Sequence, residues 1–302
     1  MEAATTELQL AHLRTLEAVA RHGSFSRAAG ELRLTQPAVS MQIRRLEHQL
    51  GLPLLERVGK RAFPTPAGDV LIAHAARARR ELECAVERLQ ELRGIVAGRV
   101  RLGTSASIST YLLPSALRRF RTRYPRTELI VVTGNAPDIT RAITENVLDL
   151  GLVSLPVRDR ELSVSPFHRD ELVAVAPPLR QWRGRRRIKA TELASEPLIL
   201  SDQGSTVRRV IDGWFARAGL TPGPPMEVGN TEASKKLVEA GLGLSVASWF
   251  SVKAEARARK LAAIPLDPPL YREIGLVRRR DKPMTPSLAA FLGVLEELKR
   301  SL

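Results

Sequence analysis

Cysteine and long apolar runs are nearly absent from this chain of 302 residues, and each absence narrows its class. A single cysteine, Cys84, permits no intramolecular disulfide, which suits a reducing compartment. We interpret Cys84 as a structural thiol, with a reactive redox sensor as the less favoured alternative. Charged residues interrupt every apolar run before the roughly 18 residues that a membrane helix needs. We therefore expect no membrane span and no membrane partner.

Acidic residues are also fewer than basic residues. Lys and Arg number 47 against 32 Asp and Glu, and the net charge of +15 favours anionic partners such as nucleic acid or small anions. A merely solubilising surface is the alternative. The opening "MEAATTELQL" has no basic stretch before an apolar run, so it lacks the features of an export signal and predicts a cytoplasmic protein. The length exceeds a usual domain of roughly 100 to 200 residues, which predicts two or more domains.

Catalytic signatures are missing as well. The histidines follow no paired metal-ligand spacing, and the G-x-S-x-G pattern of serine hydrolases is absent. The scattered histidines are His12, His22, His48, His74 and His168. We expect no metal, no cofactor and no enzymatic activity.

Residues 8–50 have the apolar spacing of three helices. The apolar stripes are Leu10, Leu13, Leu16 and Ala20, then Ala28, Ala29 and Leu32, then Val39, Ile43, Leu46 and Leu50. Thr35 is suited to cap the third helix, and Pro37 fits its first turn, where a missing N–H costs little. The opposite face of that helix remains free to contact a partner.

The short connection "LRLT" forces the second and third helices to cross closely, which describes a helix-turn-helix. The following "RVGKRAFPTPAG" places Arg57, Lys60 and Arg61 between glycine and proline, as in a short turn or β-wing. We predict a winged helix-turn-helix domain over residues 1–67.

Residues 68–93 contain no proline and predict one long linker helix. Its apolar seam alternates steps of four and three over about three heptads. The seam consists of Leu71, Ala75, Ala78, Leu82, Ala85, Leu89 and Leu92. We favour dimerisation through this seam over docking onto the chain's own core.

Two glycines in "RGIVAGRV" mark a domain boundary at about 94–98. Beyond it, short apolar runs such as "VRLGT" and "ELIVVT" alternate with helix-like stretches, the βα rhythm of a mainly parallel sheet. Residues 94–302 are therefore predicted to form an α/β unit.

With both halves placed, the chain resembles a LysR-type transcriptional regulator over its whole length. The segment "GSFSRAAGELRLTQPAVSMQIRRLEHQLGLPLLER" followed by "TPAG" is similar to the family's DNA-binding signature, with Leu55 where the family usually has Phe. The stretch "TQPAVSMQI" further resembles the subgroup that regulates carbon fixation. The resemblance implies a cytoplasmic homodimer or homotetramer that binds double-stranded promoter DNA and works with RNA polymerase.

The second half resembles the family's effector-binding domain through "GTSASISTYLLP", "LDLGLV", "EPLILSDQGSTVRR" and "EAGLGLSVAS". The resemblance implies a two-lobed fold like periplasmic solute-binding proteins, with the ligand in a cleft between the lobes. We place lobe I at about 98–164 and 270–302 and lobe II at about 165–269, with crossings near 164–167 and 267–270. A solute-binding protein for transport is the rival interpretation, but the attached basic helix-turn-helix and the missing signal argue against it.

Cationic residues crowd the predicted DNA-binding head, and only three glutamates oppose them within residues 21–61. Arg21, Arg27, Arg33, Arg44, Arg45, Arg57, Lys60 and Arg61 stand against Glu31, Glu47 and Glu56. Phosphate contacts supply affinity and base-edge contacts supply sequence. We expect DNA contacts from Arg27, Gln36, Pro37, Ala38, Met41, Arg44, Arg45, Arg57 and Arg61, an ordinary solvated side chain being the alternative for any single one.

Polar loops before predicted helices suggest where a small molecule binds, because helix N-termini favour carboxylate or phosphate groups. The resemblance implies effector contacts from Thr104, Ser105, Ser107, Asn135, Gly204, Ser205, Thr206, Thr231 and Glu232. Plain helix capping is the alternative for such hydroxyls. We expect a small anionic metabolite that shifts the equilibrium between lobe arrangements.

Two further arginine-rich runs lie outside these sites. "RQWRGRRRIK" spans residues 180–189 and carries six basic residues, and residues 278–280 are three consecutive arginines. We interpret both as solvated loops, with an anion or nucleic-acid contact as the alternative.

Overall fold

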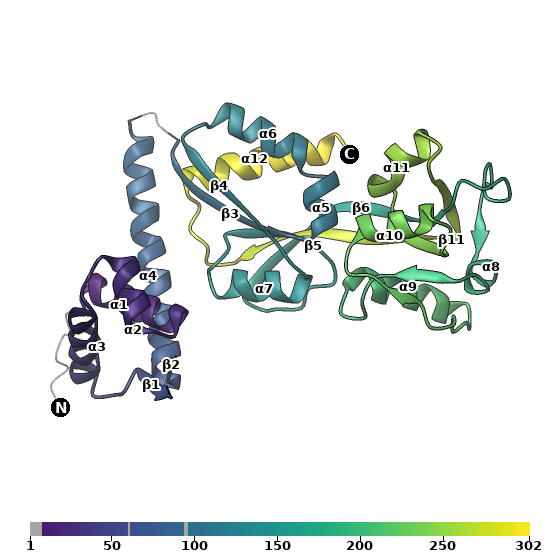
Figure 1. Cartoon of the computed structure of the whole chain (residues 1–302). Coiled ribbons are helices and arrows are strands. Elements are labelled where there is room, and N and C mark those ends of the chain that lie inside the picture. Colours follow the sequence, from purple (N-terminus) through teal and green to yellow (C-terminus); the bar gives the residue numbers. More distant parts are fainter. Residues whose placement is uncertain (1–7, 60, 94–95) are drawn as a thin grey trace. The chain divides into compact units, whose positions relative to one another are not determined.

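The computed structural model describes residues 8–59, 61–93 and 96–302 (Figure 1). The chain divides into two compact units, residues 1–86 and 87–302. Each unit is described by itself below. Among the described residues, no helix combines the length and apolarity that a membrane crossing requires.

The first unit is a helix-turn-helix with a two-stranded wing. Its elements are α1 (Leu10–His22), α2 (Phe25–Leu32), α3 (Gln36–Leu50), β1 (Leu55–Val58) and β2 (Arg61–Pro64). The Thr35 hydroxyl accepts a hydrogen bond from the N–H of Ala38 at 3.4 Å, and a proline follows in the first turn, as the sequence predicted. The apolar stripes of the three helices meet in one core that includes Leu16, Val39 and Leu46.

The wing is tied to the helices by its backbone. The N–H of Ala62 on β2 donates to the carbonyl of Gly23 at 2.9 Å, beyond the end of α1. Glu47 of α3 accepts from the N–H of Leu54 at 2.9 Å and so holds the chain entering β1. These contacts fix the wing beside α3 without help from a ligand.

A single long helix follows, α4 (Pro66–Glu91). A Cβ added to Gly68 would lie 2.1 Å from the carbonyl oxygen of Leu54, so only glycine lets the helix approach the wing this closely. Leu71 and Ala75 of the predicted seam pack into the helix-turn-helix core. The less favoured alternative, in which the seam packs onto the chain's own core, is therefore correct for Leu71 and Ala75.

The later seam residues are uncovered. Leu82 is 49% exposed, Leu89 is 63% exposed and Leu92 is 85% exposed. Cys84 is a free, buried thiol. Dimerisation through the exposed part of the seam stays a prediction.

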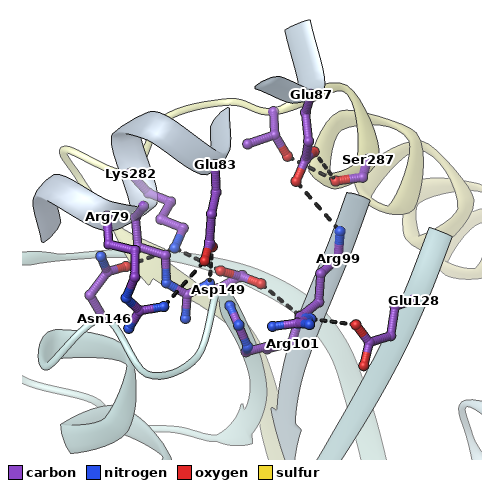
Figure 2. A network of polar contacts seen from close by, with 12 residues as sticks. Arg79, Glu83, Glu87, Arg99, Arg101, Glu128, Asn146, Asp149, Lys282 and Ser287 are labelled. Atoms are coloured by element: carbon purple, nitrogen blue, oxygen red, sulfur yellow. Dashed lines mark hydrogen bonds and ion pairs between the residues drawn. The ribbon is translucent and has the colours of Figure 1, made fainter. Parts of the chain in front are cut away.

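The two compact units divide between Val86 and Glu87, inside α4 and ahead of the predicted 94–98 boundary. The Glu87 carboxylate is the physical reason, as Figure 2 shows: it accepts from the Ser287 hydroxyl at 2.6 Å and from the N–H of Arg99 at 3.4 Å. Gly98 has a φ of +130°, and a Cβ there would lie 2.2 Å from this carboxyl carbon. The last turn of α4 thus belongs to the second unit.

The second unit is a mixed β-sheet with helices on its faces. In chain order it contains β3 (Gly98–Thr104), α5 (Ala106–Tyr111), α6 (Pro114–Arg123), β4 (Thr127–Thr133), α7 (Ala136–Thr144), β5 (Leu150–Ser154), β6 (Leu162–Ala176), β7 (Ile188–Lys189), α8 (Ala190–Ala194), β8 (Leu198–Leu200), α9 (Thr206–Arg217), β9 (Met226–Glu227), α10 (Thr231–Glu239), β10 (Leu244–Ser248), α11 (Trp249–Arg257), β11 (Ala262–Arg279) and α12 (Pro286–Arg300). The strand order is β4-β3-β5-β11-β6-β10-β8-β9, with β7 pairing with β11. Parallel pairing of β3 with β4 and β5, and of β8 with β9 and β10, confirms the predicted α/β rhythm.

Two long antiparallel strands, β6 and β11, run through both lobes of this unit (Figure 1). On β6, Phe167 packs into the core of lobe I and Leu172 into the core of lobe II. On β11, Leu270 belongs to the core of lobe II and Ile274 to that of lobe I. Each crossing therefore lies a few residues after the predicted ranges, 164–167 and 267–270.

Candidate functional site

The outward face of α3 gathers the residues predicted to read DNA. Val39, Ile43 and Leu46 are buried in the core, whereas Gln36, Pro37, Arg44 and Arg45 are exposed and Ala38 is half-buried. Met41 is 66% exposed on the same face, so this large apolar side chain makes little contribution to packing. A basic helix face with uncovered apolar groups can meet both phosphates and thymine methyl groups.

The predicted phosphate-binding arginines surround this face. Arg27 is exposed on α2, Arg57 on β1 and Arg61 on β2. The guanidinium of Arg57 lies 4.8 Å from the ring of Phe25, and that of Arg61 lies 5.5 Å from the ring of Phe63. These aromatic contacts restrain both wing arginines. Lys60 lies outside the described residues.

Some charges of the head are already engaged. Arg21 donates to Glu31 at 2.6 Å, and His22 contacts the other oxygen of the same carboxylate at 2.6 Å. The hydrogen bond with His22, followed by the charge of Arg21, lowers the pKa of the Glu31 carboxyl. Arg21 is therefore less available to phosphate than the arginines of the wing.

His12 lies buried beneath α3. Burial and, to a lesser degree, the positive charge of Arg45 lower the pKa of its imidazole. Its Nδ1 has no hydrogen-bond partner among the described residues. Both influences favour the neutral form of the ring.

A cleft of about 390 Å³ opens between the two lobes of the second unit. Six of the residues predicted to contact the effector line it, namely Ser105, Ser107, Asn135, Ser205, Thr206 and Thr231. They lie at or near the beginnings of α5, α7, α9 and α10. The beginnings of these helices thus border one cleft that is rich in hydroxyl groups.

Capping chemistry uses some of these side chains. Ser105 accepts from the N–H of Ile108 at 3.4 Å, and Asn135 accepts from the N–H of Asp138 at 2.9 Å. The Ser205 side chain makes no such capping bond. The capping alternative therefore holds for Ser105 and Asn135, which cap a helix and line the cleft at the same time.

Three predicted effector contacts are not brought to the cleft. Thr104 is fully buried, and its hydroxyl donates to the carbonyl of Leu152 at 2.8 Å. Glu232 pairs with Lys235 at 2.7 Å, and Gly204 lies on an exposed turn. None of the three lines the cleft, so these assignments are corrected.

Arg272 lines the cleft and belongs to a buried ion pair that the sequence patterns did not reveal. Arg272 on β11 donates through Nε to Asp170 on β6 at 2.6 Å, and the two residues face each other in the strand register. Ser248 of lobe II donates to the other Asp170 oxygen at 2.8 Å, and Arg272 Nη1 donates to Ser107 of lobe I at 3.2 Å. The pair lies where both strands cross between lobes.

A second contact joins the lobes beside the cleft. Lys235 of α10 donates through Nζ to the Tyr111 hydroxyl of α5 at 2.9 Å and to Glu255 at 2.6 Å. Burial is the largest single influence on the Glu255 carboxyl and would raise its pKa, but the hydrogen bond from Lys235, a backbone hydrogen bond and the charges of Lys235 and Lys236 together lower that pKa. Ser234 and Ser251, one residue before Lys235 and at the start of α11, line the cleft. Lys235 and Tyr111 therefore form a direct contact between the two lobes beside the cleft.

Comparison with known proteins assigns the family. Residues 10–69 match the family described as "Bacterial regulatory helix-turn-helix protein, lysR family", and residues 93–300 match "LysR substrate binding domain". The chain belongs to the LysR family. Its members named below are transcriptional regulators, so the predicted class of regulator rather than enzyme is confirmed. No group of His, Cys, Asp and Glu within the described part of this LysR chain could hold a metal ion.

The LysR relatives include regulators of carbon fixation. The chain is 35% identical over 285 residues to the RuBisCO operon transcriptional regulator of Allochromatium vinosum, with 94% of each chain covered. It is 33% identical over 290 residues to the HTH-type transcriptional regulator CfxR of Cupriavidus necator, covering 94% of this chain and 91% of that one. The resemblance of "TQPAVSMQI" to the carbon-fixation subgroup agrees with these relatives.

Solved LysR structures share the fold. A full-length OxyR variant from Pseudomonas aeruginosa superposes with a TM-score of 0.74 at 22% identity, covering 97% of this chain and 95% of that one. Full-length CbnR in complex with its target DNA gives a TM-score of 0.69 at 22% identity, covering 96% and 100%. The predicted helix-turn-helix joined to a two-lobed α/β domain is confirmed.

Proposed function

We propose that this LysR regulator binds an interrupted palindrome in promoter DNA as a homodimer or homotetramer, and that a small anionic metabolite in the cleft changes transcription. The observation that carries the proposal is the 390 Å³ cleft that places Arg272 at the crossing of the two lobes. A ligand there touches both lobes and the strands that connect them.

An anionic ligand suits the electrostatics of the cleft. The charge of Arg272 is balanced by Asp170, which is fully buried, so the pair itself is neutral. Positive potential comes from the N-termini of α7, α9 and α10, each of which contributes roughly half a charge; Asp138 and Glu232 in the first turns of α7 and α10 reduce it, whereas α9 has no acidic residue there. Asp202 lines the cleft from lobe II and disfavours a second negative group on that side. We expect a ligand with one or two negative charges and several hydroxyls.

The ion pair of Asp170 and Arg272, which forms a hinge where β6 and β11 cross between the lobes, can couple ligand binding to DNA binding. A ligand that accepts hydrogen bonds from Arg272 and Ser107 competes with contacts that now define the lobe arrangement. It therefore binds one arrangement better than another, and a coupling free energy of about 1 to 3 kcal/mol is enough to change the populations severalfold. Glu87, fastened to Ser287 and Arg99, carries the change to the end of α4.

The head divides its contacts by chemistry. Arg27, Arg57 and Arg61 bind phosphates, while the beginning of α3 enters the major groove. Gln36 can bridge an adenine edge, and Arg45 can reach guanine or phosphate. Pro37, Ala38 and Met41 meet thymine methyl groups, and Arg44 supports the backbone contact.

Dimerisation through the exposed half of the α4 seam brings two heads onto half-sites about one helical turn or more apart. Contact with RNA polymerase and work in the cytoplasm belong to the same proposal. The RuBisCO operon regulators among the relatives make promoters of carbon-assimilation genes the first targets to examine.

The test is a titration of labelled DNA from upstream of the protein's own gene against salt and unlabelled competitor. A dimer that neutralises roughly six to ten phosphates loses about 10³ to 10⁵ in affinity between about 50 and 200 mM salt. Arg45→Ala should weaken binding about tenfold or more, as expected for the loss of about 1 to 3 kcal/mol. Exposed Arg121→Ala in the second unit is the matched control. Binding equal to that of random DNA, or equal losses in both variants, contradicts the proposal.

A further inference from the structure

A second hollow lies in lobe II, between residues 182–185 of the basic segment and the end of α11. Its volume is about 520 Å³, within the roughly 300 to 1,000 Å³ typical of small-molecule sites. It shares no lining residue with the cleft. The segment 180–189, which the sequence suggested was a solvated loop, therefore forms one wall of a concave surface.

Positive charge from two distant parts of the sequence meets in this hollow. Arg183 and Arg185 come from the basic segment, and Arg257 and Arg259 come from the end of α11 and the turn after it. The lining contains no acidic residue. Four guanidinium groups around one volume repel one another unless an anion lies between them.

Only one of the four arginines has its charge compensated. Arg185 pairs with Glu192 at 2.6 Å. A backbone hydrogen bond from Lys189, and after it the bond from Arg185, lower the pKa of the Glu192 carboxyl, so this pair is ionised at neutral pH. Arg183, Arg257 and Arg259 form no ion pair with any residue that the structure describes. Three exposed charges therefore remain available to a ligand.

The floor of the hollow is apolar and aromatic. Trp182 is 5% exposed, and the Arg185 guanidinium lies 5.5 Å from its ring, which fixes this wall. Trp249 is 36% exposed and lines the same hollow, beside the apolar side chains of Leu261 and Ala263. An uncovered indole offers a flat face for stacking. Guanidinium groups beside it select a ligand that combines a planar ring with several negative charges.

We propose that this hollow is a second ligand site that binds a nucleoside polyphosphate, with phosphates against Arg183, Arg257 and Arg259 and the base against Trp249. The site lies apart from the cleft and goes beyond the proposed function. It gives the protein a second chemical input, independent of the metabolite bound between the lobes.

The test uses the full chain and isothermal titration calorimetry with ATP, adenosine and inorganic tripolyphosphate at low salt. ATP should bind more tightly than either fragment, because only ATP engages both the arginines and the indole. Arg257→Gln combined with Arg259→Gln should weaken ATP binding at least tenfold. The matched control combines Arg121→Gln with Arg126→Gln, which removes two exposed arginine charges from lobe I. That control should leave ATP affinity within about twofold.

Trp249→Phe supplies a second readout. It should remove the ATP-dependent change in tryptophan fluorescence and weaken ATP more than tripolyphosphate. Unchanged urea unfolding, followed by the fluorescence of Trp182 and Trp214, verifies that the second unit of each variant is folded. Equal binding of tripolyphosphate and ATP, equal losses in the two double variants, or absence of ATP binding would each overturn the proposal.

Discussion

Replacing Arg272 by methionine should destabilise the second unit markedly. The substitution keeps much of the side-chain volume but leaves the fully buried carboxylate of Asp170 without its counter-charge. Breaking one partner of a buried ion pair costs about 3 to 5 kcal/mol. Asp170 retains the hydrogen bond from Ser248 at 2.8 Å, so we expect the lower end, about 3 kcal/mol.

Urea unfolding measures this loss directly. All three tryptophans, Trp182, Trp214 and Trp249, lie in the second unit, so their fluorescence reports its unfolding and not that of the head. Asp170→Asn combined with Arg272→Met removes both charges and should recover about 1 to 3 kcal/mol relative to the sum of the single variants. This difference is the coupling free energy, which measures the interaction between Asp170 and Arg272 alone.

The neighbouring Arg169 provides the control. Its side chain is 65% exposed and lies 3.6 Å from the Glu273 carboxylate, and such surface pairs contribute at most about 1 kcal/mol. If Arg272→Met costs no more than Arg169→Met, or if the double variant shows no coupling, the reasoning about a hinge pair is refuted.

Three further outcomes are expected. Tyr111→Phe removes the hydroxyl that accepts a hydrogen bond from Lys235 but keeps the ring, so the free energy of unfolding should fall by about 1 kcal/mol in the same urea assay. The variant should also have a larger radius of gyration by X-ray scattering, because a contact between the lobes is lost. An unchanged radius would argue that this contact does not hold the lobes together. Because the pKa of His12 is lowered from 6.5, the folded head binds fewer protons than the unfolded chain, and its stability should fall as pH drops from 6.5 towards the folded value. Amide exchange in α1 and α3 measures this, and His12→Gln should abolish the dependence. Gly68→Ala forces a Cβ against the Leu54 carbonyl and should lower the stability of the head by about 1 to 3 kcal/mol, seen by circular dichroism, whereas the uncrowded Gly30→Ala should not.

Much of the head could be predicted from local sequence. The cap at Thr35, the proline in the first turn of α3 and the apolar stripes act over a few residues, so they are visible without tertiary structure. The cleft loops were predicted from the family resemblance, and the polar residues between strands and helices were only a supporting local signal. Thr104 was misassigned because the last residue of a strand can turn its side chain inward, as its bond to Leu152 shows.

The hinge and the second hollow could not be predicted in this way. Asp170 and Arg272 are brought together by the register of two strands that lie far apart in the sequence. The available signal was a charge inside an apolar strand, "RDELVAVA" and "LYREIGL", which indicates burial but not the partner. Arg183 and Arg257 likewise meet only through the packing of lobe II. Contacts between residues far apart in the sequence leave no pattern in the local sequence from which they could be predicted.

The uncovered half of the α4 seam has a thermodynamic consequence. Leu82 and Leu89 expose apolar surface in a single chain, and their burial in a dimer adds free energy that is available only when two chains meet. In the dimer that we propose, the stability of the helix follows mass action: we expect the melting temperature to rise with protein concentration, and a scarce regulator to be less assembled and more easily unfolded. Cellular abundance thereby becomes a determinant of how long each molecule survives.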